Sequence, residues 1–450
     1  MSTAVAPQPP VADDTVIERT VLADRSRSWW HLPATLTVLA LAAMVFFGLR
    51  AKAGASTTFG LAEKAALNPG KIIPETVTVP TGPATIVLTA LCLAIAAFFW
   101  WAQWANVALR PLVRIGLLAL FALLWVLGFL TWASAGSETM SIGSLLQTTI
   151  VLAVPLAFGA QAGVLSERSG VINMAIEGQL LFGAFGAALV SSLVGGALGP
   201  WAGLVAAPLM ALVIGALLAL FAVGYQVQQI IVGVVLNVFA VGLTSFFFGT
   251  VMRQNPERFN TASVLPHWRI PILADLPVIG RVLFDQNILV YLMWIIVAAL
   301  TVAMFRTRWG LRVRAVGEHP RAADTVGIDV NRTRWTNVLL GSAVAGLGGA
   351  TLTIGTNVAF GEDMSAGKGY IALAAMILGR YHPAGALAAA LLFAFADATQ
   401  LKLSAVSAGG GGIPSDVLLM LPYIVTLFAV AGVVGRVRVP AADGVPYVKQ

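Results

Sequence analysis

Ionisable and amide side chains are rare inside the apolar runs of this sequence, and a dense group of them lies in SERSGVINMAIEG, residues 166–178. Asn173 and Glu177 are four residues apart, so on one helix they would share a face with about 6 Å between them. A carboxylate in hydrocarbon costs several kcal/mol unless it is paired, protonated or in contact with water. Two interpretations follow. The pair lines or gates a polar pathway, or Glu177 binds a buried donor or caps the turn at Ser169 and Gly170 and only holds helices together.

Three further polar residues are candidates for the same pathway. Asn237 lies within a long apolar run, where a single asparagine more often makes an interhelical hydrogen bond of about 0.6 kcal/mol. Asn357 follows another apolar run. Asp397 is a stronger candidate, because it is ionisable and follows an uncharged stretch that starts at Pro383. The predicted pathway residues are therefore Asn173, Glu177, Asn237, Asn357 and Asp397.

The sequence lacks the signatures of enzymatic chemistry. Gly70-Lys71 and Gly367-Lys368 lack the preceding glycine and the following Ser or Thr of a phosphate-binding loop, and no HExxH, GxSxG or CxxC motif occurs. The four histidines show no metal-ligand spacing, and Cys92 is the single cysteine. The net charge is +7, but the sequence contains no basic stretch interleaved with aromatic residues. We therefore expect no enzyme, no metal, no cofactor and no nucleic-acid partner, so a separate subunit would have to bind any ATP.

Composition predicts an all-α, polytopic membrane protein. The 450 residues are 58% hydrophobic and only 10% charged, which is far more apolar than a soluble domain. Apolar windows that can each cross a hydrocarbon core of roughly 30 Å predict ten spans. Between the last two, the apolar run at 369–379 is too short to span and predicts a half-helix, and with the run that follows to about Gln400 it forms a re-entrant element. The ten spans are predicted at residues 34–50, 84–104, 115–133, 143–163, 172–194, 200–222, 230–250, 287–305, 335–356 and 415–434.

Charge predicts the orientation in the plasma membrane. Seven arginines lie between residues 306 and 334, and cytoplasmic loops carry an excess of Lys and Arg. That loop and both termini are therefore predicted to be cytoplasmic. Because the first three spans contain few polar residues, the predicted organisation is a tail at 1–32, a peripheral three-helix extension at 33–134, a core domain at 142–434 and a C-terminal tail at 435–450.

The arginine-rich loop contains a short helix, predicted from GLRVRAVGEHPRAADTVGI, residues 310–328. Pro320 suits the first helical position, Arg321 to Val326 continue the helix, and Gly327 suits its C-terminal stop. Isolated helices below about 12 to 15 residues are marginal in water, so another surface must hold this one. Either it packs on its own membrane domain, or it docks into a groove of a cytoplasmic partner.

Two motifs together carry a family resemblance. The stretch GVLSERSGVINMAIEGQLLFGAF, residues 163–185, and the loop RAVGEHPRAADTVGIDV, residues 314–330, resemble the permease subunits of ABC importers for simple sugars and nucleosides, and most of all the nucleoside branch. The stretches GKGYIALAAMILGRYHPAGA, residues 367–386, and IPSDVLLMLPYIVTLF, residues 413–428, are also similar. The resemblance covers residues 142–434 and implies the fold of a type II ABC importer permease.

The resemblance implies a role and a set of partners. Such a permease moves a nucleoside or related sugar-like solute inward, pairs with a second permease in a heterodimer or homodimer, and receives the solute from an extracytoplasmic binding lipoprotein. A cytoplasmic ABC ATPase would dock on the loop at Glu318, Pro320, Arg321, Ala322, Ala323, Asp324 and Gly327, and Glu362 and Asp363 would lie near the binding protein or the gate. The alternative is a secondary transporter or channel, in which Glu177 and Asp397 couple transport to an ion gradient.

Overall fold

Helices dominate the structure, a computed structural model that describes residues 30–51, 54–61, 74–136, 139–261, 263–356, 359–407, 419–420 and 438–449. The chain forms two compact units. The first holds the described residues up to Phe59 and most of Thr76–Met140, and the second holds Ser141–Ala405 together with the described C-terminal segment.

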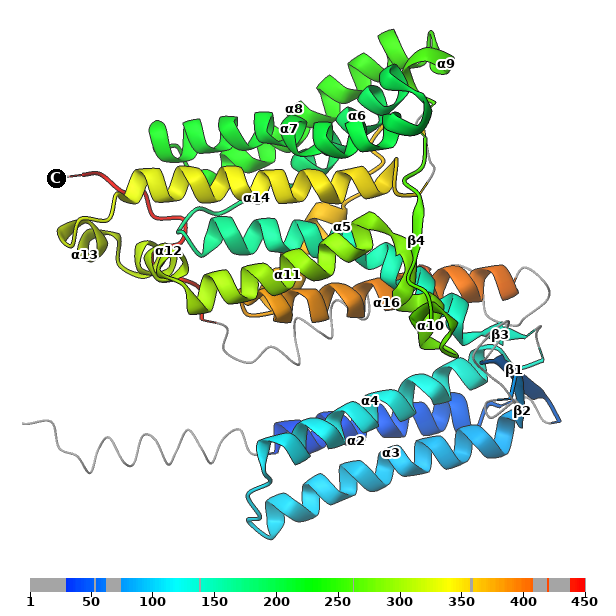
Figure 1. Ribbon diagram of the computed structural model, residues 1–450. Coiled ribbons are helices and arrows are strands. Elements are labelled where there is room, and N and C mark those ends of the chain that lie inside the picture. Colours follow the sequence, from blue (N-terminus) through cyan, green and yellow to red (C-terminus); the bar gives the residue numbers. More distant parts are fainter. Residues whose placement is uncertain are drawn as a thin grey trace, which may run out of the picture. The chain divides into compact units, whose positions relative to one another are not determined.

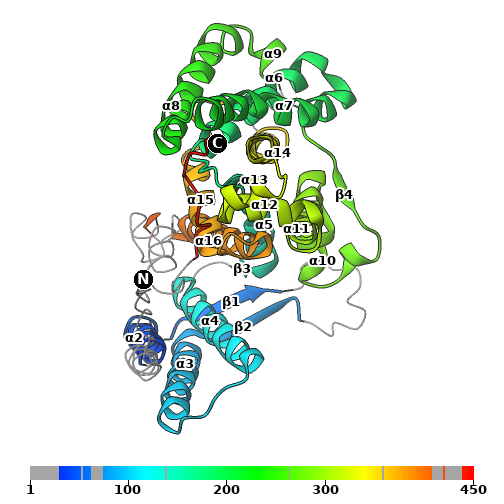
Figure 2. The same ribbon diagram turned by 90° about the vertical axis from the view of Figure 1, so that its left-hand side faces the viewer.

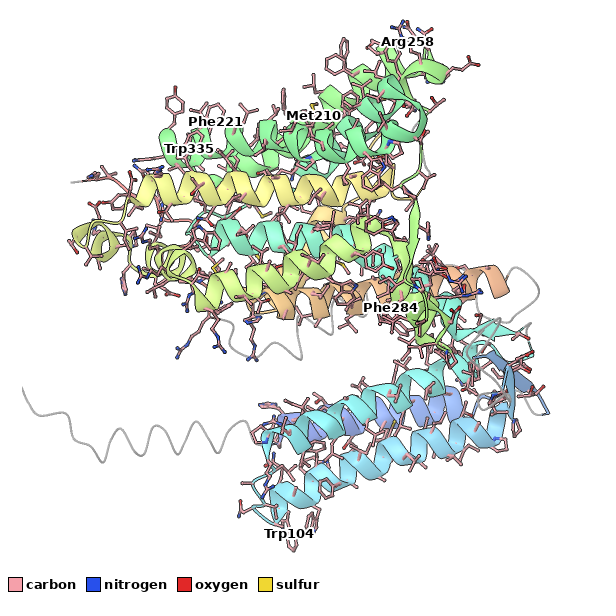
Figure 3. All side chains as sticks on the ribbon, viewed as in Figure 1. Trp104, Met210, Phe221, Arg258, Phe284 and Trp335 are labelled. Atoms are coloured by element: carbon pink, nitrogen blue, oxygen red, sulfur yellow. The ribbon has the colours of Figure 1, made fainter. Side chains whose placement is uncertain are left out.

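The first unit is built on three apolar helices that pack side by side (Figure 1). Cys92 is buried among them, with its thiol 3.8 Å from the carbonyl oxygen of Phe121. Apolar side chains also cover the outer surface, and Trp104, labelled in Figure 3, is 83% exposed. Such a surface suits a lipid environment. The elements are α2 (His31–Ala43) with the π-helical turn η1 (Met44–Gly48), α3 (Thr81–Trp104), α4 (Pro111–Ala133), and a sheet ordered β2-β1-β3 from β1 (Ser56–Gly60), β2 (Thr76–Pro80) and β3 (Met140–Ser141).

The second unit contains the longer series of helices and one short hairpin. In that hairpin β4 (His267–Arg269) pairs antiparallel with β5 (Asp285–Asn287), so that Trp268 faces Gln286. The helices are α5 (Ile142–Glu167), α6 (Ile176–Val194), α7 (Gly199–Ala219), α8 (Gln229–Phe247), α9 (Pro256–Phe259), α10 (Ile279–Phe284), α11 (Ile288–Arg306), α12 (Arg308–Glu318), α13 (Pro320–Thr325), α14 (Val330–Leu352), α15 (Lys368–Leu378) and α16 (Pro383–Ser407), joined in places by the short turns η2 (Gly196–Leu198), η3 (Leu220–Gly224), η4 (Phe248–Met252) and η5 (Leu273–Asp275).

Helix α5 lies at the centre of this unit, with α11, α14, α15 and α16 around it (Figure 2). Its C-terminal half, from Ala153 to Glu167, is buried without interruption. A second apolar cluster lies between α7, α8 and α14, where Met210 and Trp335 (Figure 3) pack against buried Ile214 and Leu218. Helix α14 approaches its neighbours closely, because a side chain on Gly346 would collide with the backbone of Ala207 on α7. The glycines of this helix therefore serve packing, as in many membrane interfaces.

The membrane prediction is confirmed in class and changed in detail. Nine helices of the described chain are long and apolar enough to cross a membrane. The half-helix at 369–379 is present as α15, which at 11 residues is about 16 Å long. The re-entrant assignment of the following run is wrong, because α16 continues for 25 residues to Ser407 and is long enough to span. The predicted span at 335–356 corresponds to α14, which begins earlier, at Val330, and ends at Leu352, and this helix is not among those nine. The predicted span at 415–434 and the predicted tail lie almost entirely outside the described residues.

Candidate functional site

Asn173 and Glu177 do not share a helix face, so that prediction is wrong. The chain turns at Gly170, which has φ +89, and runs without helix over 171–173 before α6 begins at Ile176. Asn173 is fully buried in this connection, where its side-chain amide exchanges two hydrogen bonds of 3.2 Å with Gln179. The positive φ at Gly170, which favours glycine, breaks the helical periodicity on which the prediction depended.

Glu177 joins the start of α6 to the start of α15. Its Oε1 accepts a hydrogen bond from the backbone N–H of Gly367 at 2.7 Å, and its Oε2 accepts one from Gly369 at 2.5 Å. The side chain is only 4% exposed. The carboxylate lies in the first turn of α6 and caps α15, so it is close to two helix N-termini, whose partial positive charge stabilises an anion. These contacts correspond to the buried-donor alternative for Glu177.

Asn237 on α8 completes this junction. Its Oδ1 accepts from the N–H of Gly178 at 2.8 Å, and its Nδ2 donates to the carbonyl of Met174 at 2.7 Å and to the hydroxyl of Tyr370 at 3.0 Å. Asn237 thus satisfies one of the free N–H groups at the start of α6. Its partner Tyr370 is 45% exposed although its hydroxyl binds a buried amide. Tyr370 therefore connects the buried polar groups of this junction to the protein surface.

The first turn of α15 gathers three of the five predicted pathway residues. Glu177 and Asn237 reach it through Gly369 and Tyr370, and Asp397 on α16 is partly buried and interacts electrostatically with Lys368. The other two lie elsewhere. Asn173 belongs to the connection before α6, and Asn357 lies outside the described residues. Glu362 and Asp363 are exposed on the loop before α15. The pathway assignment itself stays a prediction.

The predicted short helix is present as α13, and Gly327 follows it with φ +84. Ala323 is its buried residue and packs with Val316, Val330 and Tyr447. The outer face is open, and Val326 is 74% exposed. The helix is therefore held by its own chain while a second face stays available. Of the residues predicted for coupling, Glu318, Arg321, Ala322 and Gly327 are exposed, Pro320 and Asp324 are partly exposed, and Ala323 is buried.

Arg168 anchors the far end of α15 to the connection between α5 and α6. Its Nε donates to the carbonyl of Tyr381 at 2.9 Å, in the turn that follows the end of α15 at Leu378. Beside it, the His382 ring stacks on Phe305, with the two ring centroids 4.6 Å apart. Burial and the charge of Arg168 lower the pKa of His382. The stretch SERSGVINMAIEG, residues 166–178, thus reaches both ends of α15, through Glu177 at its start and Arg168 after its end.

Sequence reasoning missed four residues of these junctions, namely Tyr370, Tyr381, Arg334 and Asp443. Arg334 is 2% exposed and donates to the carbonyl of Val445 at 2.9 Å. In the sequence, Arg334 stands directly before an apolar run, and it was interpreted only as one of the arginines of the basic loop. Asp443 lies in a short polar C-terminal sequence that carries no pattern. Within the described ranges, no three His, Cys, Asp or Glu side chains gather in a way that could hold a metal.

Comparison with known proteins places the chain in a family of transport proteins. The model for the branched-chain amino acid transport system / permease component matches residues 145–430. The guanosine ABC transporter permease protein NupQ of Bacillus subtilis is 37% identical over 313 residues, which are 67% of this chain and 95% of that protein. The nucleoside ABC transporter permease protein NupC of Lactococcus lactis is 35% identical, with the same two shares.

A more distant match names a different solute. The putative glucose ABC transporter permease protein TsgC13 of Haloferax volcanii is 31% identical over 58% of this chain and 78% of that protein. No solved structure matches the chain significantly. The family model covers more than half of the chain, and two relatives above 30% identity are matched over almost their whole length. The chain therefore belongs to this family of membrane permease components.

Proposed function

We propose that this chain is the transmembrane subunit of an ABC importer that moves nucleosides into the cytoplasm. The observation that carries the proposal is the match to the two permeases named for guanosine and for nucleosides, each covered over 95% of its length. The junctions at the two ends of α15 lie within the matched region. ATP would be bound by a separate subunit, and residues 33–134 would form a peripheral extension, since the match begins only at residue 145.

The end of the second unit that carries α12 and α13 is proposed to face the cytoplasm. Its exposed arginines, Arg306, Arg308, Arg312, Arg321 and Arg332, support that orientation. Both termini would then be cytoplasmic. The open face of α13 would receive the ATPase, and the exposed loop with Glu362 and Asp363, before α15, would face the binding lipoprotein. A second permease, identical or related, would complete the importer.

The solute pathway is proposed to pass the first turn of α15. Tyr370 is exposed there beside Asn237, and Lys368 and Asp397 add polar groups to an otherwise apolar surface. An aromatic ring beside hydrogen-bonding groups suits a nucleobase, because base–aromatic stacking contributes about 1–3 kcal/mol per base. Glu177 would act by holding α15 in place and not by contact with the solute.

Accessibility of position 370 tests the pathway. In a Cys92→Ala background, Tyr370→Cys in the assembled importer is expected to react with a water-soluble maleimide about tenfold faster than Val205→Cys, because thiolates form in water and not in lipid. Val205 on α7 is the matched control, since it is 63% exposed on an apolar face. Added nucleoside should slow the reaction at position 370 alone. Equal rates at the two positions would remove Tyr370 from the pathway.

Reconstitution tests the function as a whole. Liposomes that contain this chain, its partner permease and the ATPase are expected to take up nucleoside only with ATP and the binding protein present. A variant of the ATPase that binds but does not hydrolyse ATP serves as the control. Uptake by this chain alone, driven by an ion gradient, would instead favour a secondary transporter, in which Glu177 and Asp397 couple the ion.

A further inference from the structure

The side-chain amide of Asn237 has one fixed orientation. Its Oδ1 accepts a hydrogen bond from the N–H of Gly178 at 2.8 Å, and its Nδ2 donates to the carbonyl of Met174 at 2.7 Å. A backbone N–H only donates and a carbonyl only accepts, so exchanging the amide oxygen with the nitrogen would break both hydrogen bonds. The second hydrogen of Nδ2 is therefore the one that Asn237 directs at Tyr370.

This orientation decides the direction of the hydrogen bond between Asn237 and Tyr370. The two atoms, Nδ2 and the hydroxyl oxygen, are 3.0 Å apart, and the hydroxyl oxygen is the acceptor because an amide NH₂ group only donates. The O–H bond of a phenol stays near the plane of its ring, where the oxygen has two positions for partners. The N–H of Asn237 occupies one position, so the proton of Tyr370 points to the other. In the part of the chain that the structure describes, no acceptor receives that proton.

This hydroxyl lies near the middle of the membrane. Helix α15 runs beside α5 in the same direction, because a side chain on Gly159 would meet Ala372 at 2.7 Å and one on Gly163 would meet Met376 at 2.6 Å. Tyr370, two residues before Ala372, is then about ten residues, or about 15 Å, from the C-terminal end of α5. The hydrocarbon core is roughly 30 Å thick. Transporters commonly place their solute sites at this depth, where broken helices begin or end.

We propose that Tyr370 selects among nucleosides, favouring those with a carbonyl group over those with an amino group on the edge of the base that meets it. The inference rests on the proposed function, since it takes the solute to be a nucleoside that passes Tyr370. A carbonyl oxygen accepts the free proton of the hydroxyl. An amino group in the same place directs its own hydrogens at that proton. The 45% exposed ring provides the surface on which the solute meets the hydroxyl.

Inosine and adenosine are suitable probes, because inosine has a carbonyl group where adenosine has an amino group and their sugars are identical. A hydroxyl of the ribose can both donate and accept, so a fixed donor does not distinguish one sugar hydroxyl from another. The preference should therefore arise at the base alone. One hydrogen bond gained against one lost corresponds to a difference in affinity of about threefold to tenfold.

Equilibrium binding to the assembled importer in nanodiscs, without the binding protein, tests the selection. Saturation-transfer NMR measures weak binding of each nucleoside, and inosine is expected to bind about threefold to tenfold more tightly than adenosine. Tyr370→Phe keeps the ring and removes the proton, so the two affinities should come within about twofold of each other. Tyr225→Phe is the matched control, since Tyr225 is 68% exposed at the end of η3, and it should keep the preference.

Asn237→Asp tests the direction of the hydrogen bond. The aspartate still accepts from the N–H of Gly178 but offers no amide hydrogen to Tyr370, so the hydroxyl turns its proton towards position 237. The solute then meets an acceptor, and the preference should shift towards adenosine by about threefold or more. The double variant with Tyr370→Phe should behave as Tyr370→Phe alone, because the aspartate acts through the hydroxyl. If Asn237→Asp lowers the amount of folded protein, Tyr370→Phe still decides the question.

Three results would overturn the inference: no binding of either nucleoside, equal affinities in the unsubstituted importer, or a preference that Tyr370→Phe leaves unchanged. These results are separate from a failure of the proposed function, because binding is measured without ATP hydrolysis or uptake. ATP-driven nucleoside uptake together with any of the three would leave the importer in place and remove Tyr370 as the selecting residue. A preference that depends on Tyr370, without ATP-driven uptake, would support the site and contradict the importer.

Discussion

Glu177→Gln is expected to lower the stability of the permease and to slow nucleoside uptake about tenfold or more. The carboxylate accepts from both Gly367 and Gly369, and a glutamine amide offers one acceptor and directs N–H groups at the other donor. One buried N–H left without a partner costs about 1–3 kcal/mol. Loss of the negative charge near two helix N-termini adds to that cost. Thermal unfolding in detergent and uptake in proteoliposomes measure the two effects.

The matched control for this prediction is Glu257→Gln. Glu257 is an exposed carboxylate in the first turn of α9, so the same chemical change should leave both the unfolding temperature and uptake near their original values. Amounts in the membrane should be similar for both variants after expression. A Glu177→Gln protein with unchanged unfolding temperature and strongly reduced uptake would show that the side chain acts on the solute, as the pathway interpretation holds.

The helices could be predicted because their apolar periods are local properties of the sequence. The same holds for α13, whose proline, length and glycine stop all lie within residues 320–327. The error over Asn173 had a local cause too, since a single glycine with positive φ ended the periodicity on which the shared face depended. Helix length at α16 was underestimated because the apolar run was taken to end at about Gln400, whereas the helix continues to Ser407.

The partners of the polar residues could not be predicted, because they lie far away in the sequence. Glu177 binds residues 190 and 192 positions later, and Asn237 binds Tyr370 133 positions later. No period or motif encodes such pairs. The sequence limited Glu177 to two roles, a pathway group or a buried bond, and the contacts with Gly367 and Gly369 give weight to the second. Arg334 shows the same limit, since nothing around it marks its hydrogen bond to the carbonyl of Val445, 111 positions later.

Val326→Glu is expected to abolish association with the ATPase while it leaves the permease folded. Val326 directly follows α13 and is 74% exposed, so the change removes little packing from the permease itself. In a complex the new carboxylate would be buried in the interface without a partner. Such a change typically costs 2–5 kcal/mol of binding, so association should weaken by about 30-fold or more. ATP hydrolysis that co-purifies with the tagged chain measures the effect.

Leu198→Glu is the matched control. Leu198 is 71% exposed on η2, between α6 and α7, and the substitution introduces the same charge there. It should retain the co-purified ATP hydrolysis. Val326→Thr, which keeps the shape without the charge, should lie near the original protein. Both glutamate variants should unfold at nearly the same temperature as the unsubstituted chain, since exposed substitutions usually change stability by no more than about 0.5 kcal/mol. Full ATPase association by Val326→Glu would show that the partner binds elsewhere, and α13 would then serve only to position its neighbours within the permease.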